Sequence, residues 1–250
     1  MAVSPGFAPH PWALFTSRAL LNSLGVRITL HHSDRLPAHP AAIVVSNHRS
    51  FLDAPLMMVG MDRPVRIACH PYMTQVPLLR EAVHFLGCIP IDGPKQQPKT
   101  FVPTATQTLQ ENYPVGLFPE GGGPMVSVTA PDHLGKFHRG FVHLALHANM
   151  PEPLPIVPMA IASTQETWSF VAPFKLFRWF APSEPLFHRP GWHPTVVYHR
   201  VHLVIGHPIW ITADHRQRYH GKQAGVLTKK LTQDCEEAIA QLLAEGLGYG

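Results

Sequence analysis

The sequence predicts a single α/β domain with a mostly parallel central sheet flanked by helices. Short, almost continuously apolar runs alternate with longer segments of helical character, and this alternation is typical of a parallel sheet that is buried on both faces. The chain has 250 residues, of which 45% are hydrophobic, enough for one substantial core. No internal repeat or low-complexity linker divides it. We therefore expect one domain over residues 26–250, preceded by a helical segment over residues 1–25.

The apolar runs and the prolines give the expected elements in order. Strands are expected where apolar and β-branched residues run together, at 26–30, 41–45, 65–68, 88–91, 115–118 and 156–161. Helices are expected where apolar and polar residues mix over longer stretches, at 54–60, 78–85, 104–112 and 141–149. Pro55 and Pro103 lie near the first turn of two of these helices, where proline is tolerated.

The N-terminal segment contains a further expected helix, over residues 11–24. Trp12, Phe15 and Ala19, with Leu20 or Ser23, recur at helical spacing, so one face of this helix would be apolar. Such a helix can lie on a bilayer surface or cover the sheet, and the sequence leaves both alternatives open.

The most informative motif directly follows the expected strand at 41–45. It is the block Asn47-His48-Arg49-Ser50-Phe51-Leu52-Asp53. A histidine whose pKa lies near neutrality can accept a proton from a hydroxyl group, and a neighbouring carboxylate can fix its tautomer. On a regular helix His48 and Asp53 would lie about 140° apart. Pro55, however, places the helix start near residues 52–54 and leaves His48 in a turn before it, so the two side chains can meet.

Three further blocks accompany this motif, and together they indicate a family. They are Gly87-Cys88-Ile89-Pro90-Ile91-Asp92, Phe118-Pro119-Glu120-Gly121-Gly122 and Pro155-Ile156-Val157-Pro158-Met159-Ala160. In this order and at these separations, the four blocks resemble those of the glycerolipid acyltransferases, the family of glycerol-3-phosphate and 1-acyl-glycerol-3-phosphate acyltransferases. The resemblance spans roughly residues 40–210 and includes the turn at 206–209. It makes residues 26–250 an expected acyltransferase domain.

The resemblance implies a reaction and a role for each matching residue. His48, oriented by Asp53, would remove the proton from a lipid hydroxyl as its oxygen attacks an acyl thioester, either acyl-coenzyme A or an acyl carrier protein. No cofactor, metal or covalent nucleophile is required. The expected substrate-binding residues are Glu120, which would help to hold the polar end of the acceptor, Gly121, Asp92, and Pro158, which would shape the acyl-binding region. His48, Asp92 and Glu120 each follow an expected strand, so these motifs should converge if the strands are parallel neighbours.

The chain departs from the family pattern where phosphate would be bound. Members that use phosphate-bearing acceptors carry arginines at two positions that are Gly93 and Gly123 here, and arginine is the side chain best suited to bidentate phosphate binding. The nearest cations that could replace them are Lys95, Lys136 and Arg139. The expected acceptor is 1-acyl-glycerol-3-phosphate, in phospholipid biosynthesis. The alternatives are a glycolipid, diacylglycerol or isoprenoid alcohol, hydrolysis with water as acceptor, and a non-catalytic lipid-binding relative.

Some motifs also have a purely structural interpretation. Ser50 and Asp53 resemble a capping box, and His48 is one of 18 histidines. His143 and His147 have the spacing of a zinc pair, but no acidic neighbour or third ligand accompanies them, and a structural or surface role is favoured.

Two other features concern thiol chemistry and phosphate binding. Cys88 has apolar neighbours within an expected strand and is interpreted as a packed thiol. The three glycines at 121–123 would suit either a phosphate-binding nest or a flexible loop.

Composition and pattern favour a peripheral protein on the cytoplasmic face of a membrane. The sequence shows no secretory signal and no uninterrupted apolar run of about 18 residues, and its three cysteines form no C-x2-C pair. A formal net charge of +4 favours anionic headgroups or an acidic carrier protein, whereas no cationic cluster is dense enough for nucleic acid. Residues 168–180 hold six aromatic and two cationic side chains, a mixture suited to the headgroup level of a bilayer.

Overall fold

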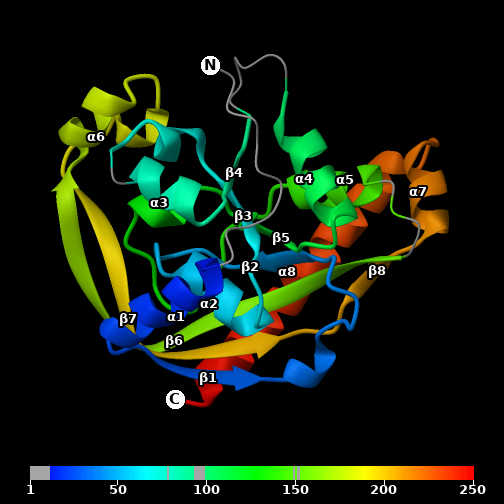
Figure 1. Cartoon of the computed structure of the whole chain (residues 1–250), viewed down its shortest axis with the longest axis horizontal. Helices are drawn as coiled ribbons and strands as arrows, with labels where there is room; N and C mark the ends of the chain where they lie inside the picture. Colours follow the sequence, from blue (N-terminus) through cyan, green and yellow to red (C-terminus); the bar gives the residue numbers. More distant parts are fainter. Residues whose placement is uncertain (1–11, 78, 93–98, 149, 151–152) are drawn as a thin grey trace.

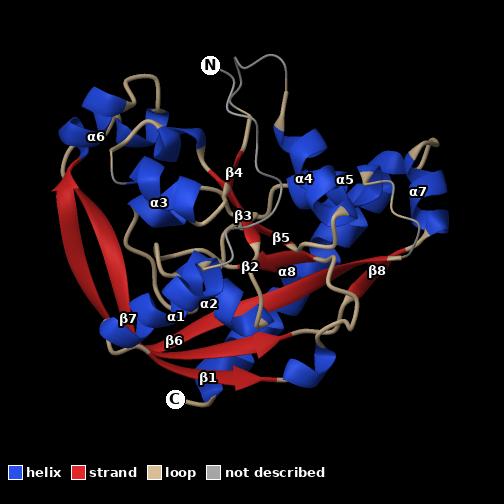
Figure 2. Ribbon diagram, in the orientation of Figure 1, coloured by secondary structure: helices blue, strands red, loops and turns tan. Residues whose placement is uncertain are grey.

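A twisted eight-stranded sheet organises the molecule (Figures 1 and 2). The computed structural model describes residues 12–250 except 78, 93–98, 149 and 151–152. Within these residues the strands lie in the order β1-β7-β6-β2-β5-β3-β4, and β8 pairs with β6. The strands are β1 (Arg27–His31), β2 (Ile43–Ser46), β3 (Arg66–Cys69), β4 (Ile89–Pro90), β5 (Val115–Leu117), β6 (Leu154–Pro173), β7 (Trp192–Ile205) and β8 (Ile209–Ile211).

The sheet is mostly parallel, as the sequence predicts. Strand β2 pairs in parallel with β5 and β6, β3 pairs in parallel with β4 and β5, and β1 pairs in parallel with β7. Only the β6–β7 and β6–β8 pairs among the described residues are antiparallel. Since β2 and β5 are neighbours, the loops that follow their carboxyl ends meet at the same edge of the sheet.

Helices cover both faces, and strand β2 shows why. Ile43 and Val45 pack into a cluster with α4 (Phe101–Gln110), α5 (Gly140–His147) and α8 (Ala224–Gly248). Val44, between them, packs on the opposite side with α1 (Ala13–Ser23) and α2 (Asp53–Met61). Successive side chains of a strand point to opposite faces, so an unbroken apolar strand requires a cover on both sides.

Most expected elements lie close to their observed positions. The expected helix at 54–60 is α2, and the helices at 78–85, 104–112 and 141–149 correspond to α3 (Leu79–Phe85), α4 and α5; residues 78 and 149 lie outside the described residues. Strand β6 continues twelve residues beyond the expected end at 161, and the helices and strands that follow it, from residue 174 to residue 248, have no counterpart among the expected elements. The expected strand at 88–91 is reduced to two residues in β4.

The long strands β6 and β7 form a hairpin that carries a separate small cluster. At its far end β6 leads directly into α6 (Phe174–Phe180), seen at the upper left in Figure 1. Beneath α6 lies a hydrophobic cluster of buried side chains, Tyr72, Val76, Val126, Phe174, Ala181 and Phe187. Short 3-10 turns contribute to it, at Pro71–Thr74, Pro124–Val126 and Pro185–Phe187; a fourth lies at Ser33–Arg35.

The two ends of the described chain pack on the sheet. Helix α1 contacts α2, and its Ala13 and Leu21 are fully buried, while residues 1–11 of the expected N-terminal segment lie outside the described residues. The chain ends with α7 (Ala213–Tyr219) and α8, a 25-residue helix that packs along β6 and β7. None of the helices within the described residues is long and apolar enough to span a bilayer.

Candidate active site

His48 and Asp53 form the expected pair. The distance between His48 Nδ1 and Asp53 Oδ2 is 2.9 Å, and α2 begins at Asp53, which leaves His48 in the preceding loop. The same Oδ2 atom accepts hydrogen bonds from the backbone N–H groups of Arg49 (2.6 Å) and Ser50 (2.7 Å). Asp53 therefore closes the loop and also holds the imidazole. Only one half of the expected capping box is present, the bond from the Ser50 N–H, because α2 begins at Asp53 itself and its N-cap residue is Leu52. The catalytic role of the pair stays a prediction.

A tyrosine from strand β7 completes the surroundings of Asp53. The Tyr198 hydroxyl, on β7, donates a hydrogen bond of 3.0 Å to Asp53 Oδ1. Asp53 and Tyr198 are 0% and 1% exposed. Burial, and next the negative charge of Asp53, raises the pKa of Tyr198 well above its usual range, so this phenol keeps its proton and acts as a donor. Sequence reasoning missed Tyr198 because it lies 145 residues beyond Asp53 and in no recognised block.

The orientation of the His48 ring leaves one nitrogen available. Nδ1 donates to Asp53, and the ring stacks on Phe118 at a centroid distance of 4.1 Å and an angle of 11°. With the proton on Nδ1, Nε2 is the acceptor nitrogen. None of the described residues makes a hydrogen bond to Nε2, and the side chain is 18% exposed. His48 can therefore accept a proton from a molecule that reaches it from solvent.

Glu120 follows β5 and fixes the backbone of the histidine. Its Oε1 accepts a hydrogen bond of 2.9 Å from the His48 backbone N–H, and its Oε2 accepts one from the Gly135 N–H. Burial raises the pKa of Glu120, although the two backbone donors act in the opposite direction. The expected convergence of the blocks around His48 and Glu120 is thus found. Both carboxylate oxygens are used by the protein itself, and acceptor binding by Glu120 stays a prediction.

Asn47 and Arg49, on either side of His48, attach the loop to β6. The Asn47 side chain accepts from Ile161 N (2.8 Å) and donates to Ile161 O (3.0 Å). Arg49 donates to both carboxylate oxygens of Glu166, at 2.9 and 2.7 Å, and its guanidinium lies 5.7 Å from the centroid of the Trp168 ring. These contacts indicate that both residues support the loop that carries His48.

Asp92 lies apart from this cluster. It follows β4, which two strands, β5 and β3, separate from β2. Its Oδ1 accepts hydrogen bonds from Thr100 N (2.7 Å) and Thr100 Oγ1 (3.1 Å), and its Oδ2 accepts one from Phe101 N (3.0 Å). Asp92 thus caps the start of α4. Its expected role in substrate binding stays a prediction.

Comparison with known proteins assigns the family. Residues 27–162, just over half of the chain, match the sequence profile of the Acyltransferase family. The chain belongs to this family. Its resemblance to the glycerolipid acyltransferases is thereby confirmed, and the matched residues contain the histidine–aspartate pair and all of its partners except Tyr198.

Two plant proteins are similar to more than half of the chain, and one solved structure is similar to most of it. A 1-acyl-sn-glycerol-3-phosphate acyltransferase of Cocos nucifera is 27% identical over 155 residues, which cover 61% of this chain and 47% of the relative. A protein of the same name from Limnanthes alba is 28% identical over 134 residues, covering 51% and 43%. The chain thus spans about half the length of these relatives. The crystal structure of the 1-acyl-sn-glycerophosphate (LPA) acyltransferase PlsC from Thermotoga maritima has a TM-score of 0.58 at 16% identity and covers 93% of this chain and 77% of its own, which shows a shared fold.

The cations expected to replace the missing arginines lie on the loop beside the third block. Lys136 and Arg139 are both exposed, and the backbone between them is fixed by the hydrogen bond from His138 N to Pro119 O (2.9 Å). Gly123 has open space around it. Gly93 and Lys95, which belong to the same prediction, lie outside the described residues. Phosphate binding by Lys136 or Arg139 remains a prediction.

Two other residues expected to contact substrate are Pro158 and Gly121. Pro158 is a buried residue of β6 that pairs in register with Val45 of β2, three residues before His48. Gly121 adopts a φ of +70°, which glycine adopts without steric cost. The expected roles of Pro158 in acyl binding and of Gly121 in a phosphate nest stay predictions.

Two motifs have structural explanations outside the site. Tyr219 Oη lies 2.8 Å from His143 Nδ1 and 3.0 Å from His147 Nε2, so one phenol joins the histidine pair. No group of side chains in the described residues is arranged to hold a metal ion. Cys88 is a half-buried free thiol beside the strand pair β3–β4, as expected for a packed cysteine.

Proposed function

We propose that the protein transfers a fatty acyl group from an acyl thioester to the hydroxyl of a lipid, with 1-acyl-glycerol-3-phosphate as the acceptor. The observation that carries this proposal is His48, held by Asp53 and Phe118, with its side chain 18% exposed and Nε2 not bonded to any described residue. Family membership supports the acyl transfer, and the printed names of the two plant relatives support the acceptor.

The reaction needs one base and no covalent enzyme intermediate. Nε2 of His48 takes the proton from the acceptor hydroxyl while its oxygen forms a bond to the thioester carbonyl carbon. The tetrahedral intermediate then collapses, the carbon–sulfur bond breaks, and the imidazolium returns the proton to the departing thiolate. The negative charge of Asp53 stabilises the imidazolium between these steps. Each step uses only the substrates and the described side chains.

An acceptor without phosphate is the second candidate. The observation in its favour is Gly123, which stands in open space where phosphate-binding members have an arginine. If Lys136 or Arg139 replaces that arginine, substitution by glutamine should raise KM for 1-acyl-glycerol-3-phosphate and leave KM for the donor unchanged. Unchanged KM values for the phosphorylated acceptor would exclude this replacement.

The deciding experiment combines a variant with a panel of acceptors. Labelled acyl-coenzyme A and acyl carrier protein are each supplied with 1-acyl-glycerol-3-phosphate, diacylglycerol, a glycolipid, an isoprenoid alcohol or no acceptor. His48→Ala should lower transfer about 10²- to 10⁴-fold, whereas His220→Ala, at an exposed position far along the chain, should not. Full activity of His48→Ala would refute the proposal, and fatty acid release without acceptor would indicate a hydrolase.

We further place this activity at the cytoplasmic face of a membrane, where a lipid acceptor and a thioester donor meet. The three cysteines are free thiols, which supports a reducing compartment. The formal net charge of +4 supports attraction to an anionic surface or an acidic carrier protein.

A further inference from the structure

Exposed apolar side chains gather at the end of the molecule that carries α6. They lie on α6 and on the far end of the β6–β7 hairpin, which we call the distal surface: Phe170, Val171, Leu176, Trp179, Phe180 and Trp192. Trp179 is 77% exposed, Phe170 60% and Trp192 55%. In Figure 1 this end lies at the upper left, opposite α7. A dense apolar patch of this kind marks an interaction site on a water-soluble surface.

The exposed rings do not belong to an unfinished core. The opposite side of α6 is already packed, since Phe174 is buried against Phe187 and His193, and Phe177 stacks on Phe187 at 5.3 Å. Arg189 also covers the Phe174 ring, at 5.3 Å from its centroid. The outward side chains are thus presented on a fixed support, as an anchoring surface requires.

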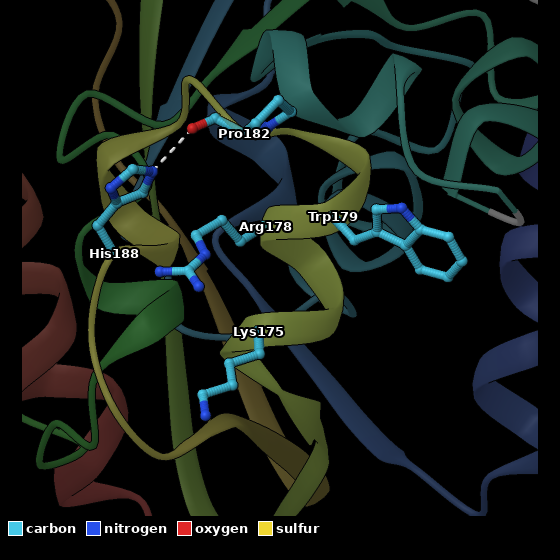
Figure 3. A pocket seen from close by; sticks show the side chains of 5 residues that line it. All are labelled: Lys175, Arg178, Trp179, Pro182 and His188. Carbon is cyan, nitrogen blue, oxygen red and sulfur yellow. Dashed lines mark hydrogen bonds between the residues drawn. The ribbon is translucent and has the colours of Figure 1, made fainter.

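Two cations accompany these rings. Lys175 and Arg178 lie three residues apart on α6 and so share one side of the helix; Figure 3 shows them on the side that faces His188, while Trp179 points away. With Trp179, Pro182 and His188 they line an open pocket of about 640 Å³. None of these five lining residues is acidic, and no described carboxylate forms an ion pair with Lys175 or Arg178. The pocket therefore has the charge to bind an anion.

We propose that the distal surface binds a membrane that contains anionic phospholipid. Lys175 and Arg178 bind the headgroup phosphates, and Trp179 inserts at the boundary between headgroups and acyl chains, the level that amphipathic aromatic rings prefer. The surface offers large rings and two cations with few fixed hydrogen-bond donors, which suits a fluid lipid layer better than an acidic protein. This inference names the surface behind the membrane location proposed above and rests on that part of the proposed function.

The same strand connects this surface to the candidate active site. Glu166 of β6 binds Arg49, the neighbour of His48, and Phe170 follows four residues later on that strand. At the rise of an extended strand, these four residues span about 13 Å. Binding through the distal surface would thus hold the histidine close to the layer from which a lipid acceptor enters.

The test measures binding of the full chain to vesicles by co-sedimentation. Phosphatidylcholine vesicles are compared with vesicles that also contain phosphatidylglycerol. Replacing Lys175 and Arg178 with glutamine should weaken binding to the anionic vesicles about 30-fold, since each cation contributes about fivefold at such a surface. The matched control replaces Lys222 and Lys229, two exposed cations near α8, and changes the net charge equally. Equal weakening by the control pair would overturn the proposal.

A second pair of variants tests the aromatic contribution. Trp179→Ser should weaken binding about tenfold through the loss of buried apolar area, while Trp210→Ser, 45% exposed on β8, should leave it unchanged. Absence of binding to either vesicle overturns the proposal. A second outcome would also overturn it. If both α6 variants bind vesicles normally but lose acyl transfer from acyl carrier protein only, the partner of this surface is an acidic protein. Acyl transfer in detergent, measured in parallel, shows separately whether the proposed chemistry holds.

Discussion

Replacing Tyr198 with phenylalanine removes a single hydroxyl from the surroundings of the His48–Asp53 pair. Asp53 would keep its bonds from His48, Arg49 and Ser50 but lose the donor at Oδ1. A hydrogen bond to a charged group contributes about 1.5–3 kcal/mol. For a chain of this size, that loss lowers the melting temperature by about 3–12 °C. If half of the larger value is expressed in the transition state, kcat falls about tenfold.

The assay combines thermal unfolding with steady-state acyl transfer. Because the Tyr198 hydroxyl is buried away from solvent, KM for donor and acceptor should stay constant while kcat falls. Tyr249→Phe is the matched control, since it removes a phenol–carboxylate bond of 2.7 Å to Glu245 at an exposed position. Because that bond is exposed to solvent, its loss should leave the melting temperature and kcat nearly unchanged. Equal melting temperatures and equal kcat for Tyr198→Phe and the unaltered chain would refute the positioning role.

Three further predictions concern α8, α4 and the hairpin. Gly246→Ala should destabilise by about 1–3 kcal/mol in urea unfolding, because a Cβ would lie 2.5 Å from Ala162 Cβ, whereas Gly248→Ala, with open space around it, should not. Asp92→Ala should cost about 0.5–2 kcal/mol through loss of the α4 cap, and a raised acceptor KM in the same variant would add a role in binding. Burial lowers the pKa of His193, so its contribution to stability is present above its ordinary pKa and is lost as pH falls below about 6.5. The melting temperature should drop across that range, and less steeply in His193→Gln.

The parallel half of the fold was predictable because local pattern and tertiary structure agree there. Strand β2 is buried on both faces and is apolar except for its last residue, Ser46, so its hydrophobic run alone predicts a strand. The end of β6 is different. After Ser163 its burial alternates or is lost, and a cluster of rings there indicates a surface as readily as a strand. Only pairing with β7 makes this segment extended, and that partner lies tens of residues away.

The residues of the candidate site also differ in how far they could be predicted from local sequence. His48, Asp53 and Glu120 follow strand ends within blocks that can be read from the sequence, and the structure brings them together. Asp92 occurs in a block of equal quality, yet it caps α4 because β4 lies at the edge of the sheet. The role of Tyr198 could not be predicted from the sequence. Tyrosine is common in strands, and only the structure shows that its hydroxyl contacts a buried carboxylate.

The loop at residues 48–53 has a consequence for how this motif varies. Asp53 Oδ2 accepts three hydrogen bonds, from the His48 imidazole and from the next two backbone N–H groups. The hydrogen-bonded loop therefore closes only at one chain length. Phe51 lies within this loop and is 46% exposed, so its side chain can change without disturbing the hydrogen bonds that close the loop. The motif therefore depends more on the number of residues than on their identity. An inserted or deleted residue should abolish the contact between His48 and Asp53, while many side chains should be accepted at position 51.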